Sequence, residues 1–335
     1  MKNYAINIKS KQNFILVSDF IDSDIDIAGQ IQTVINNNPN RTIYFPDGVY
    51  TIEKPIYTSA KPTKSVDLQL SNYAVIKAAD SWNYEDAMIC LGGIDAANDI
   101  VTNGSNYSLT GGIIDGSGIA DGISIDSGRE TAVRNVSIKH TRVGLHIKKG
   151  ANNLSSDADI MNVNIVGNNS SDSIGVLIEG FDNTLTNMRI AHVFTGVMLK
   201  GSGNFLRNIH PLFNSGYINY TDSYGFRDEV GSNWYNNCYS DNFGIGFYNE
   251  KEGIYDSCFC YWYSNKGEIH TAFKTKGQFN SIVTNLKIGF FDKSSENIVL
   301  KVGEDGGKVI FERIIADKSF ITDFSYEKYL IGGIL

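Results

Sequence analysis

The stretch "NMRIAHVFTGVML", residues 187–199, contains two short alternating apolar and polar segments, one beginning at Asn187 and one at Gly196. Segments like the first recur every 20 to 29 residues: "NVSI" at 135, "NVNI" at 162, "NIHP" at 208, "NCYS" at 237, "SCFC" at 257 and "NLKI" at 285. Segments like the second lie between them: "GLHI" at 144, "GVLI" at 175, "GFRD" at 225, "GFYN" at 246 and "AFKT" at 272. Because such strands can pair only with their equivalents in neighbouring repeats, the period predicts an all-β, parallel β-solenoid.

Strand alternation predicts which side chains of each repeat face the core. The inward positions of the first segment are Val136, Val163, Met188, Ile209, Cys238, Cys258 and Leu286. The outward positions, roughly 4.8 Å apart from repeat to repeat, are Ser137, Asn164, Arg189, His210, Tyr239, Phe259 and Lys287. The outward positions of the second segment are Ser124, His146, Leu177, Met198, Arg227, Tyr248 and Lys274. Two vertical files of outward side chains should therefore run along the solenoid.

One sizeable helix is predicted, near the N-terminus. In "DIAGQIQTVINN", residues 26–37, Ile27, Ile31, Val34 and Ile35 repeat at helical spacing behind a capping aspartate. The stretch "RTIYFPDGVYTIEKPI" that follows, residues 41–56, predicts a strand, a Pro-Asp-Gly turn and a second strand. We expect a single domain over residues 1–335, with an N-terminal cap and first strands at 1–60, rungs at 61–316 and a C-terminal cap at 317–335.

Composition and charge exclude several function classes. The chain has 33 Gly but 5 Pro, a net charge of -8 and no Lys/Arg run, which argues against nucleic-acid or anionic-membrane partners. Neutral sugars remain compatible. The sequence shows neither a signal peptide nor an 18-residue apolar run. We therefore expect a soluble, cytoplasmic protein, with a secreted or virion-associated one as the alternative.

The four cysteines, Cys90, Cys238, Cys258 and Cys260, lack metal-ligand spacing and suit a reduced interior. Neither a metal nor a cofactor is expected.

The first outward file is the candidate functional surface. Arg189, His210, Tyr239 and Phe259 lie in it, Trp234 precedes it, and Trp262 lies just past the end of one strand. Aromatic faces, polar donors and a carboxylate are what a sugar ring needs, so the file predicts carbohydrate binding. Arg227 and His270 are further candidate substrate contacts. The alternative is that these aromatics only cover turns or contact another subunit.

Asp241 and Glu252 are the candidate catalytic pair. Glycosidic cleavage uses two carboxylates, about 5 to 9.5 Å apart. A strand of the same rung separates these two acids, which places them roughly 15 to 20 Å apart in a regular coil. Either the turn folds back, or Asp241 of one subunit meets Glu252 of the next. Each carboxylate could equally cap a turn or be solvated.

The helix, "IYFPDGVYTI" and the rungs resemble the pectate-lyase-like, right-handed parallel β-helix superfamily. Within it, "IHP", "NCYSDNFGIGF" and "CYWYSNKGEIHTAF", in residues 209–273, resemble the inulin fructotransferases, glycoside hydrolase family 91. This resemblance implies a homotrimer with active sites between subunits, and an aspartate and a glutamate at the spacing of Asp241 and Glu252.

The reaction that the resemblance implies is intramolecular fructosyl transfer on a fructan or fructo-oligosaccharide, which forms or reopens a difructose dianhydride. Glu252 would handle protons and Asp241 would stabilise the oxocarbenium-like centre, or the reverse. The chain is shorter than typical secreted members, which favours a short oligosaccharide over polymeric inulin. The alternatives are a phage tailspike-like or other β-helix polysaccharide depolymerase and a non-catalytic glycan-binding β-helix.

Overall fold

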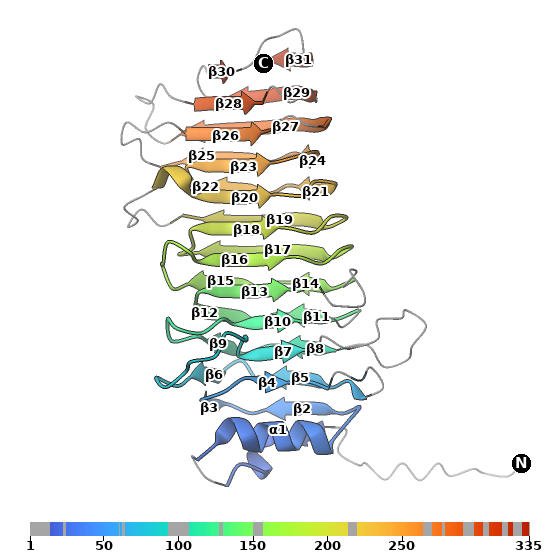
Figure 1. The fold of residues 1–335 in the computed structure, drawn as a ribbon, viewed down its shortest axis with the longest axis vertical. Coiled ribbons are helices and arrows are strands. Elements are labelled where there is room, and N and C mark those ends of the chain that lie inside the picture. Colours follow the sequence, from blue (N-terminus) through green and yellow to red (C-terminus); the bar gives the residue numbers. More distant parts are fainter. Residues whose placement is uncertain are drawn as a thin grey trace, which may run out of the picture.

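The repeats wind into a right-handed parallel β-helix, which is seen here in a computed structural model (Figure 1). The structure describes residues 14–22, 25–59, 61, 64–92, 107–126, 130–149, 157–213, 220–263, 270–276, 279–290, 298–303, 308–316, 321–323 and 330–334. The coils stack from helix α1 (Ile27–Asn37) at one end to strands β30 (Ile321–Asp323) and β31 (Leu330–Ile334) at the other. The all-β, parallel β-helix prediction is confirmed.

Each coil contributes strands to two parallel sheets, which we call sheet A and sheet B. Sheet A bends once in each coil, so that it has a first arm and a second arm. The first arm contains β2 (Thr42–Phe45), β5 (Asp67–Leu70), β8 (Ser108–Thr110), β11 (Ala132–Arg134), β14 (Asp159–Met161), β21 (Asn233–Asn236) and β24 (Gly253–Asp256). The second arm contains β3 (Gly48–Ile52), β6 (Ala74–Ala78), β9 (Ile113–Asp115), β12 (Ser137–Thr141), β15 (Asn164–Gly167), β22 (Tyr239–Asp241) and β25 (Phe259–Trp262).

Longer strands run through both arms: β17 (Thr184–Ala191), β19 (Phe205–Leu212), β27 (Ser281–Phe290) and β29 (Val309–Ala316). Strand β1 (Phe14–Leu16), followed by a 3₁₀ turn at Val17–Asp19, pairs with β2, and β31 pairs with β29. Sheet B contains β4 (Ile56–Tyr57), β7 (Ile89–Leu91), β10 (Ile123–Ile125), β13 (Val143–Ile147), β16 (Ile174–Ile178), β18 (Thr195–Leu199), β20 (Tyr224–Asp228), β23 (Ile245–Asn249), β26 (His270–Thr275), β28 (Ile298–Val302) and β30. A 3₁₀ turn at Tyr220–Asp222 precedes β20.

The residue that opens each first segment makes the bend between the two arms, and it is asparagine in all of them except "SCFC", which begins with Ser257. Asn135, Asn162, Asn187, Asn208, Asn237 and Asn285 all have φ between 52° and 57°. Asparagine tolerates this left-handed conformation better than most residues with a side chain. The amide of Asn208 also donates to Asn187 at 2.8 Å. Backbone geometry therefore explains the recurring asparagine, and no ligand is needed to account for it.

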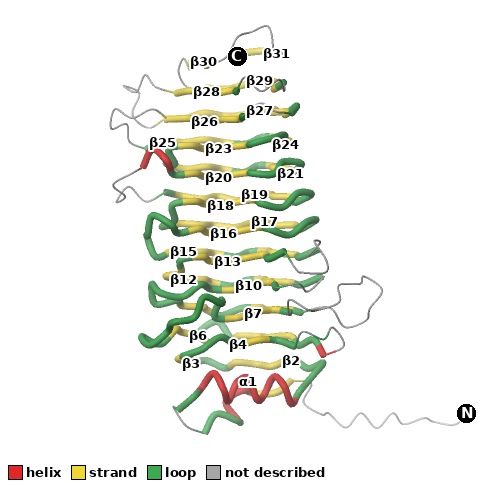
Figure 2. The backbone as a smooth tube through the Cα atoms, viewed as in Figure 1, coloured by secondary structure: helices red, strands yellow, loops and turns green. Residues whose placement is uncertain are grey.

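Helix α1 closes the N-terminal end of the solenoid (Figure 2). It begins after Asp26, whose side chain accepts a hydrogen bond from the Gly29 amide at 3.1 Å, as a helix N-cap does. Its predicted apolar face, which includes Ile31 and Ile35, is buried against the first coil. The predicted strands flanking the Pro-Asp-Gly turn are β2 and β3.

Predicted inward residues form the core. Val136, Val163, Met188, Ile209, Cys238, Cys258 and Leu286 are each at most 1% exposed. All four cysteines are buried and free. Burial raises the pKa of the Cys90 thiol to about 12, so that it remains an unreactive thiol.

A buried polar ladder runs through three coils beneath the first arm. Asn183 donates from its backbone and side chain to Oδ1 of Asn204, and Asn204 donates in the same way to Oδ1 of Asn233, at 2.8 to 3.1 Å. The Asn233 amide donates in turn to Asp228 Oδ2 at 3.0 Å, and Tyr235 donates to the same oxygen at 2.9 Å. These side chains are at most 1% exposed. The ladder fixes the register of the turns that enter the first arm.

A glycine opens every second segment except "AFKT", which begins with Ala272, and this glycine lets sheet B approach the core of the second arm. A Cβ added at Gly196 would lie 2.4 Å from the carbonyl oxygen of Gly225 and 2.4 Å from Cβ of Pro211. Similar clashes occur at Gly144, Gly175, Gly225 and Gly246. The recurring glycine thus reflects close packing between rungs.

We expect Gly196→Ala to destabilise the protein by about 1–3 kcal/mol, because overpacking forces rungs apart. The free energy of unfolding, measured by urea titration, checks this. The control is Ser202→Ala in the neighbouring turn, which should change it by less than about 0.5 kcal/mol. Equal stability of both variants would contradict the packing argument.

Candidate active site

Outward residues of the second arm form the predicted vertical file. The register pairs Arg189 with His210, Tyr239 with Phe259, and Phe259 with Lys287. The rings of His210 and Tyr239 stack at 4.0 Å with an interplanar angle of 15°, and those of Tyr239 and Phe259 at 4.7 Å with 25°. Nζ of Lys287 lies 5.1 Å from the Phe259 ring centroid. We call His210, Tyr239 and Phe259 the aromatic file.

The aromatic file presents ring edges, because each stacked face is covered by the next ring. The prediction that these faces would stack on a sugar is therefore wrong for the faces between His210, Tyr239 and Phe259. The spacing between rungs is close to the stacking distance of two rings. The imidazole and phenol polar atoms lie on the ring edges. This surface can therefore contact a ligand by hydrogen bonds more readily than by ring stacking.

Asp241 lies two residues after Tyr239, between Leu212 and Tyr261 in the register of the second arm. Tyr239 donates from its hydroxyl to Asp241 Oδ2 at 3.1 Å, and Nε2 of His210 lies 3.5 Å from the same oxygen. The Asp241 side chain is 15% exposed. Its other oxygen, Oδ1, is buried and accepts no hydrogen bond from the described residues.

The surroundings of Tyr239 keep its phenol protonated. Burial first, and then the Asp241 carboxylate, raise the pKa of Tyr239 above its ordinary value, so that its phenol stays protonated and donates. A buried acceptor without a donor costs free energy until a ligand or water supplies one. Because Oδ1 itself is enclosed, a substrate hydroxyl would meet the exposed part of the Asp241 carboxylate, which can accept a hydrogen bond or a proton there. This is the chemistry of a general base or a charge-stabilising carboxylate.

Glu252 lies far from Asp241 within one chain. Asp241 ends β22, whereas Glu252 follows β23, so the whole strand Ile245–Asn249 separates them by roughly 15 to 20 Å. Ser232 donates from its hydroxyl to Glu252 Oε1 in the turn before the first arm. The wide separation of the two acids within one regular coil stays a prediction, and the position of β23 between them supports it.

Two predicted contacts are in the core. Trp262 is 1% exposed and donates from Nε1 to the Phe243 carbonyl at 2.7 Å. His270 is 1% exposed and its ring stacks on Trp262 at 5.1 Å. Both side chains are packed between the sheets, so the prediction that they contact substrate is wrong.

Two other predicted contacts are on the surface but away from Asp241. Arg227 is on sheet B, where its Nη2 lies 2.7 Å from Glu229 Oε1 and its guanidinium covers the Tyr224 ring at 5.0 Å. Trp234 is 41% exposed on the first arm, across the asparagine bend from the aromatic file. Only Arg189, His210, Tyr239 and Phe259 among the predicted contacts share the second-arm face with Asp241.

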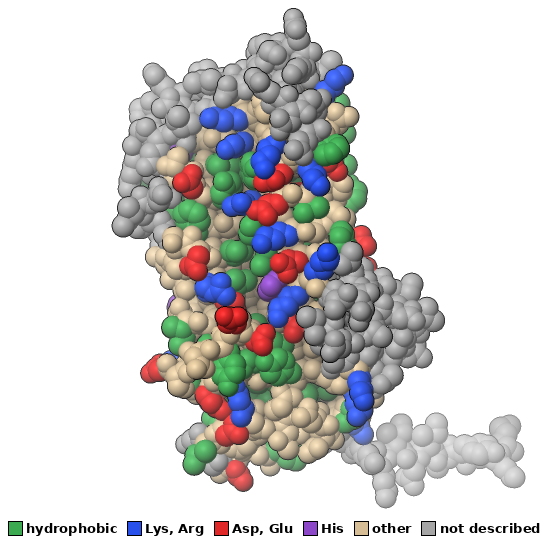
Figure 3. All heavy atoms as spheres, in the orientation of Figure 1, with side chains coloured by type: hydrophobic (Ala, Val, Ile, Leu, Met, Phe, Trp, Pro, Cys, Tyr) green, Lys and Arg blue, Asp and Glu red, His purple; other side chains and the backbone are tan. Residues whose placement is uncertain are grey.

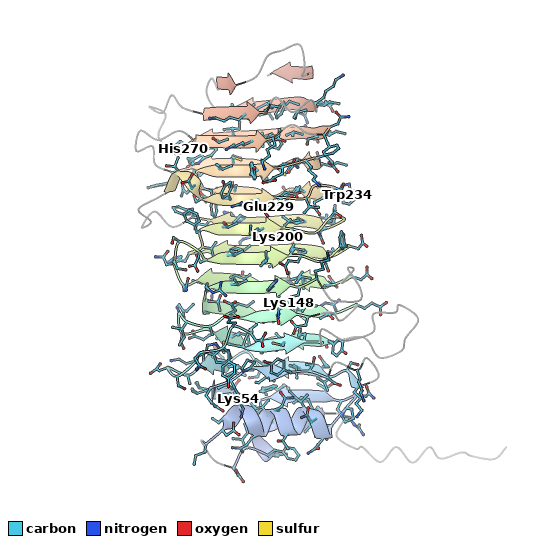
Figure 4. The ribbon with its side chains drawn as sticks, viewed as in Figure 1. Lys54, Lys148, Lys200, Glu229, Trp234 and His270 are labelled. Atoms are coloured by element: carbon cyan, nitrogen blue, oxygen red, sulfur yellow. The ribbon has the colours of Figure 1, made fainter. Side chains whose placement is uncertain are left out.

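A charged file, which was not predicted from the sequence, runs along the edge of sheet B. Its successive residues are Asp126, Lys148, Glu179, Lys200, Glu229, Glu250 and Lys276. Figure 4 shows Lys148, Lys200 and Glu229 near the middle of this face, and Figure 3 shows both signs of charge interspersed there. Glu250 pairs with Lys276 at 2.7 Å and Lys148 with Asp126 at 3.1 Å. Glu250 and Asp126 are already paired with lysines, so a ligand would have to compete with those lysines. Asp241 Oδ1 has no such partner among the described residues.

Burial of His270 makes stability depend on pH. Burial lowers its pKa to about 4 from an ordinary 6.5, so between these values the unfolded chain binds a proton that the folded chain does not. Stability is then full above pH 6.5 and decreases as the pH falls to about 4, by at most about 3 kcal/mol from this residue. Urea unfolding of wild type and His270→Phe from pH 7 to 4 checks this. Their stability difference should change with pH by that amount, and a constant difference would refute it.

No group of His, Cys, Asp or Glu within the described ranges could hold a metal ion. Nor does any described helix have the length and apolar character needed to cross a membrane.

Comparison with known proteins identifies the class through the fold. No family model and no curated protein matches the chain. Solved structures do match. The ORF18 protein of Geobacillus virus E2 has a TM-score of 0.58 at 13% identity, over 94% of this chain and 62% of that one. PfbA, a surface adhesin of Streptococcus pneumoniae, has a TM-score of 0.58 at 13% identity, over 93% of this chain and 91% of that one. The catalytic unit of the GH87 α-1,3-glucanase of Streptomyces thermodiastaticus has a TM-score of 0.54 at 12% identity, over 96% of this chain and 68% of that one.

These likenesses establish the fold: the chain is a parallel β-helix protein, and it spans less than two thirds of the viral protein. The resemblance to the inulin fructotransferases stays a proposal.

Proposed function

We propose that this protein is a glycan-cleaving enzyme whose active site is on the second arm of sheet A, with Asp241 as a catalytic carboxylate. The observation that supports this most directly is the Asp241 carboxylate beside the Tyr239 phenol and the His210 imidazole, with its buried Oδ1 left without a hydrogen-bond donor among the described residues. Such a carboxylate, in a surface that still admits solvent, is typical of a functional site. Arg189, which is exposed one rung below His210, would hold a sugar hydroxyl.

The fold supports a glycan as the substrate. The α-1,3-glucanase from Streptomyces thermodiastaticus, which has this fold, acts on a polysaccharide according to its name. A polysaccharide can lie along the rungs and contact several successive residues of one file. His210 and Tyr239 would then offer hydrogen bonds to successive sugar hydroxyls, whereas Phe259, which has no polar side-chain atom, would offer only its ring edge.

A finer proposal is intramolecular fructosyl transfer in a homotrimer, with Asp241 of one protomer beside Glu252 of the next. A fructose hydroxyl would attack C2 of its neighbour as the bond from C2 to the leaving oxygen breaks. The proton lost by the attacking hydroxyl balances the one gained by the leaving oxygen, so no water is consumed. Glu252 would carry protons, and Asp241 would stabilise the positive charge developing at C2, or the reverse. The separation of the two acids within one chain supports a site between protomers.

Glycan binding without cleavage is the second candidate. The register neighbours of Asp241 on its arm are Leu212 and Tyr261, so one chain does not place a second carboxylate beside it in the register. A lone carboxylate suits recognition better than glycoside cleavage. An adhesin, PfbA, shares the fold, as does a viral protein. A virion-associated polysaccharide depolymerase would be a case of the first proposal, glycan cleavage.

Product analysis separates these functions. The protein would be incubated with inulin, a difructose dianhydride and α-1,3-glucan, and the products followed by thin-layer chromatography and a reducing-end assay. Dianhydride formed without new reducing ends indicates transfer, and new reducing ends indicate hydrolysis. Retention on an immobilised glycan without turnover of a panel that includes capsular polysaccharides would refute the enzymatic proposal.

A further inference from the structure

A straight file of large apolar side chains runs along the outside of the first arm. Its residues, which we call the apolar stripe, are Phe205, Trp234, Ile254, Ile282 and Ile310. Each is between 37% and 42% exposed. Figure 4 shows Trp234 at the edge of the solenoid, projecting away from it. Five successive rungs thus present an apolar side chain to solvent at the same position.

The fold does not require the apolar stripe. The inward neighbours Leu206, Tyr235, Tyr255, Val283 and Phe311 are at most 1% exposed and already form the core beneath it. Lower in the same column, the register continues through Thr184 and Asp159, which are polar. A polar residue therefore fits this position. The change to apolar residues above Thr184 needs another explanation.

The area of the apolar stripe suits a protein interface. Five side chains at about 40% exposure contribute roughly 400 Å², taking about 200 Å² for a whole residue of this size. That is as large as the largest apolar patch on many monomers. A standard interface buries about 800 Å² on each partner, somewhat more than half of it apolar. The stripe and its polar borders would supply most of one such surface.

Its chemistry and spacing favour a second copy of this chain as the partner. Three of its five residues are isoleucines, which offer a sugar neither a flat ring face nor a hydrogen bond, and the two aromatic residues, Phe205 and Trp234, lie together at one end. Most of the stripe is therefore poorly suited to a glycan. Its side chains repeat at the rung spacing of about 4.8 Å. A partner surface with the same spacing can interdigitate with all five rungs at once. A second copy of this chain has that spacing because it has the same fold.

We propose that the apolar stripe is the self-association surface of this protein, where it packs on a second copy of the chain. The contact would border Glu252, which lies two residues before Ile254 and is held by Ser232. The inference does not depend on glycan cleavage, but the finer proposal of a site between protomers requires a self-association surface of this kind. It names the surface that would bring one protomer's Glu252 to an interface.

Sedimentation velocity tests the self-association. Wild type should be oligomeric at micromolar concentration, and Ile254→Glu should shift it towards the monomer by at least tenfold in dissociation constant. The matched control is Ile315→Glu, because Ile315 is also 40% exposed but lies on the second arm. Circular dichroism confirms that each variant is folded. A monomeric wild type, or equal effects of the two variants, would overturn the proposal.

Cysteine cross-linking provides a second test that does not disturb the interface. Since all four native cysteines are buried, Ile254→Cys or Trp234→Cys adds an exposed thiol to the described surface. Mild oxidation should give a covalent dimer of Ile254→Cys, and Ile315→Cys should give none. Self-linking of Trp234→Cys as well indicates parallel protomers. Linking of Trp234→Cys to Ile282→Cys in a mixed sample, without self-linking, indicates antiparallel ones.

Failure of cross-linking at all stripe positions would overturn the inference. Glycan cleavage would be tested separately, by turnover of the wild-type protein, whereas a monomeric protein would also overturn the finer proposal of a site between protomers.

Discussion

Asp241→Asn should lower the rate of glycan cleavage by about 10²- to 10⁴-fold, the range expected for the loss of a catalytic acid or base. The amide has nearly the same shape as the carboxylate and still accepts the Tyr239 hydrogen bond, so the aromatic file should remain in place. It can neither take up a proton nor stabilise a developing positive charge. The initial rate on the glycan that the wild type turns over measures the loss, with KM determined alongside.

The matched control is Asp182→Asn, an exposed turn residue with φ of 60°, a conformation that asparagine tolerates well. It should retain the wild-type rate. If Asp241→Asn retains it too, Asp241 is not the catalytic carboxylate. If Asp241→Asn loses binding to the same extent as turnover, Asp241 is a binding residue, and the second candidate function gains support.

The fold could be predicted because its determinants are local and repeat in the sequence. Each Asn at the bend reflects a left-handed backbone conformation, and each Gly of sheet B reflects close approach of a neighbouring strand. Alternation within the segments then fixes the inward residues. The repeat supplied these signals many times, so that single departures such as Ser257 did not obscure them.

The candidate site was harder to predict, because it depends on where strands end and how rings are oriented. Alternation from Phe259 through Cys260 and Tyr261 puts Trp262 inside, and β25 continues to Trp262. A strand that ended at Tyr261 would place the indole outside, and for this reason the predicted position of Trp262 is wrong. The residues of the aromatic file were predicted correctly from the alternation. Their ring faces cover one another because the spacing between rungs is close to the stacking distance of two rings, and this consequence was not predicted.

Asn204→Leu should destabilise the protein by about 3–5 kcal/mol, because the leucine leaves several buried polar groups without partners. Asn204 Oδ1 accepts from the backbone and side chain of Asn183, and its amide donates to Asn233 and to the carbonyl of Gly201. Each unsatisfied buried group costs about 1–3 kcal/mol. Urea unfolding measures the loss. Asn164→Leu, the same change on the exposed outer face, should alter stability by less than about 0.5 kcal/mol.

The effect of Asn204→Leu should also spread along the solenoid. Each rung contacts only its neighbours, so weakening one lowers the cooperativity between the rungs on either side. The ladder passes from Asn183 to Asp228, whose carboxylate accepts from Asn233, from Tyr235 and from the Gly231 backbone. Burial raises the pKa of Asp228 above its ordinary value. We therefore expect hydrogen exchange to increase most in the rungs of Asn183 and Asn233. Uniform exchange across the solenoid would show that the ladder satisfies local groups without coupling the rungs.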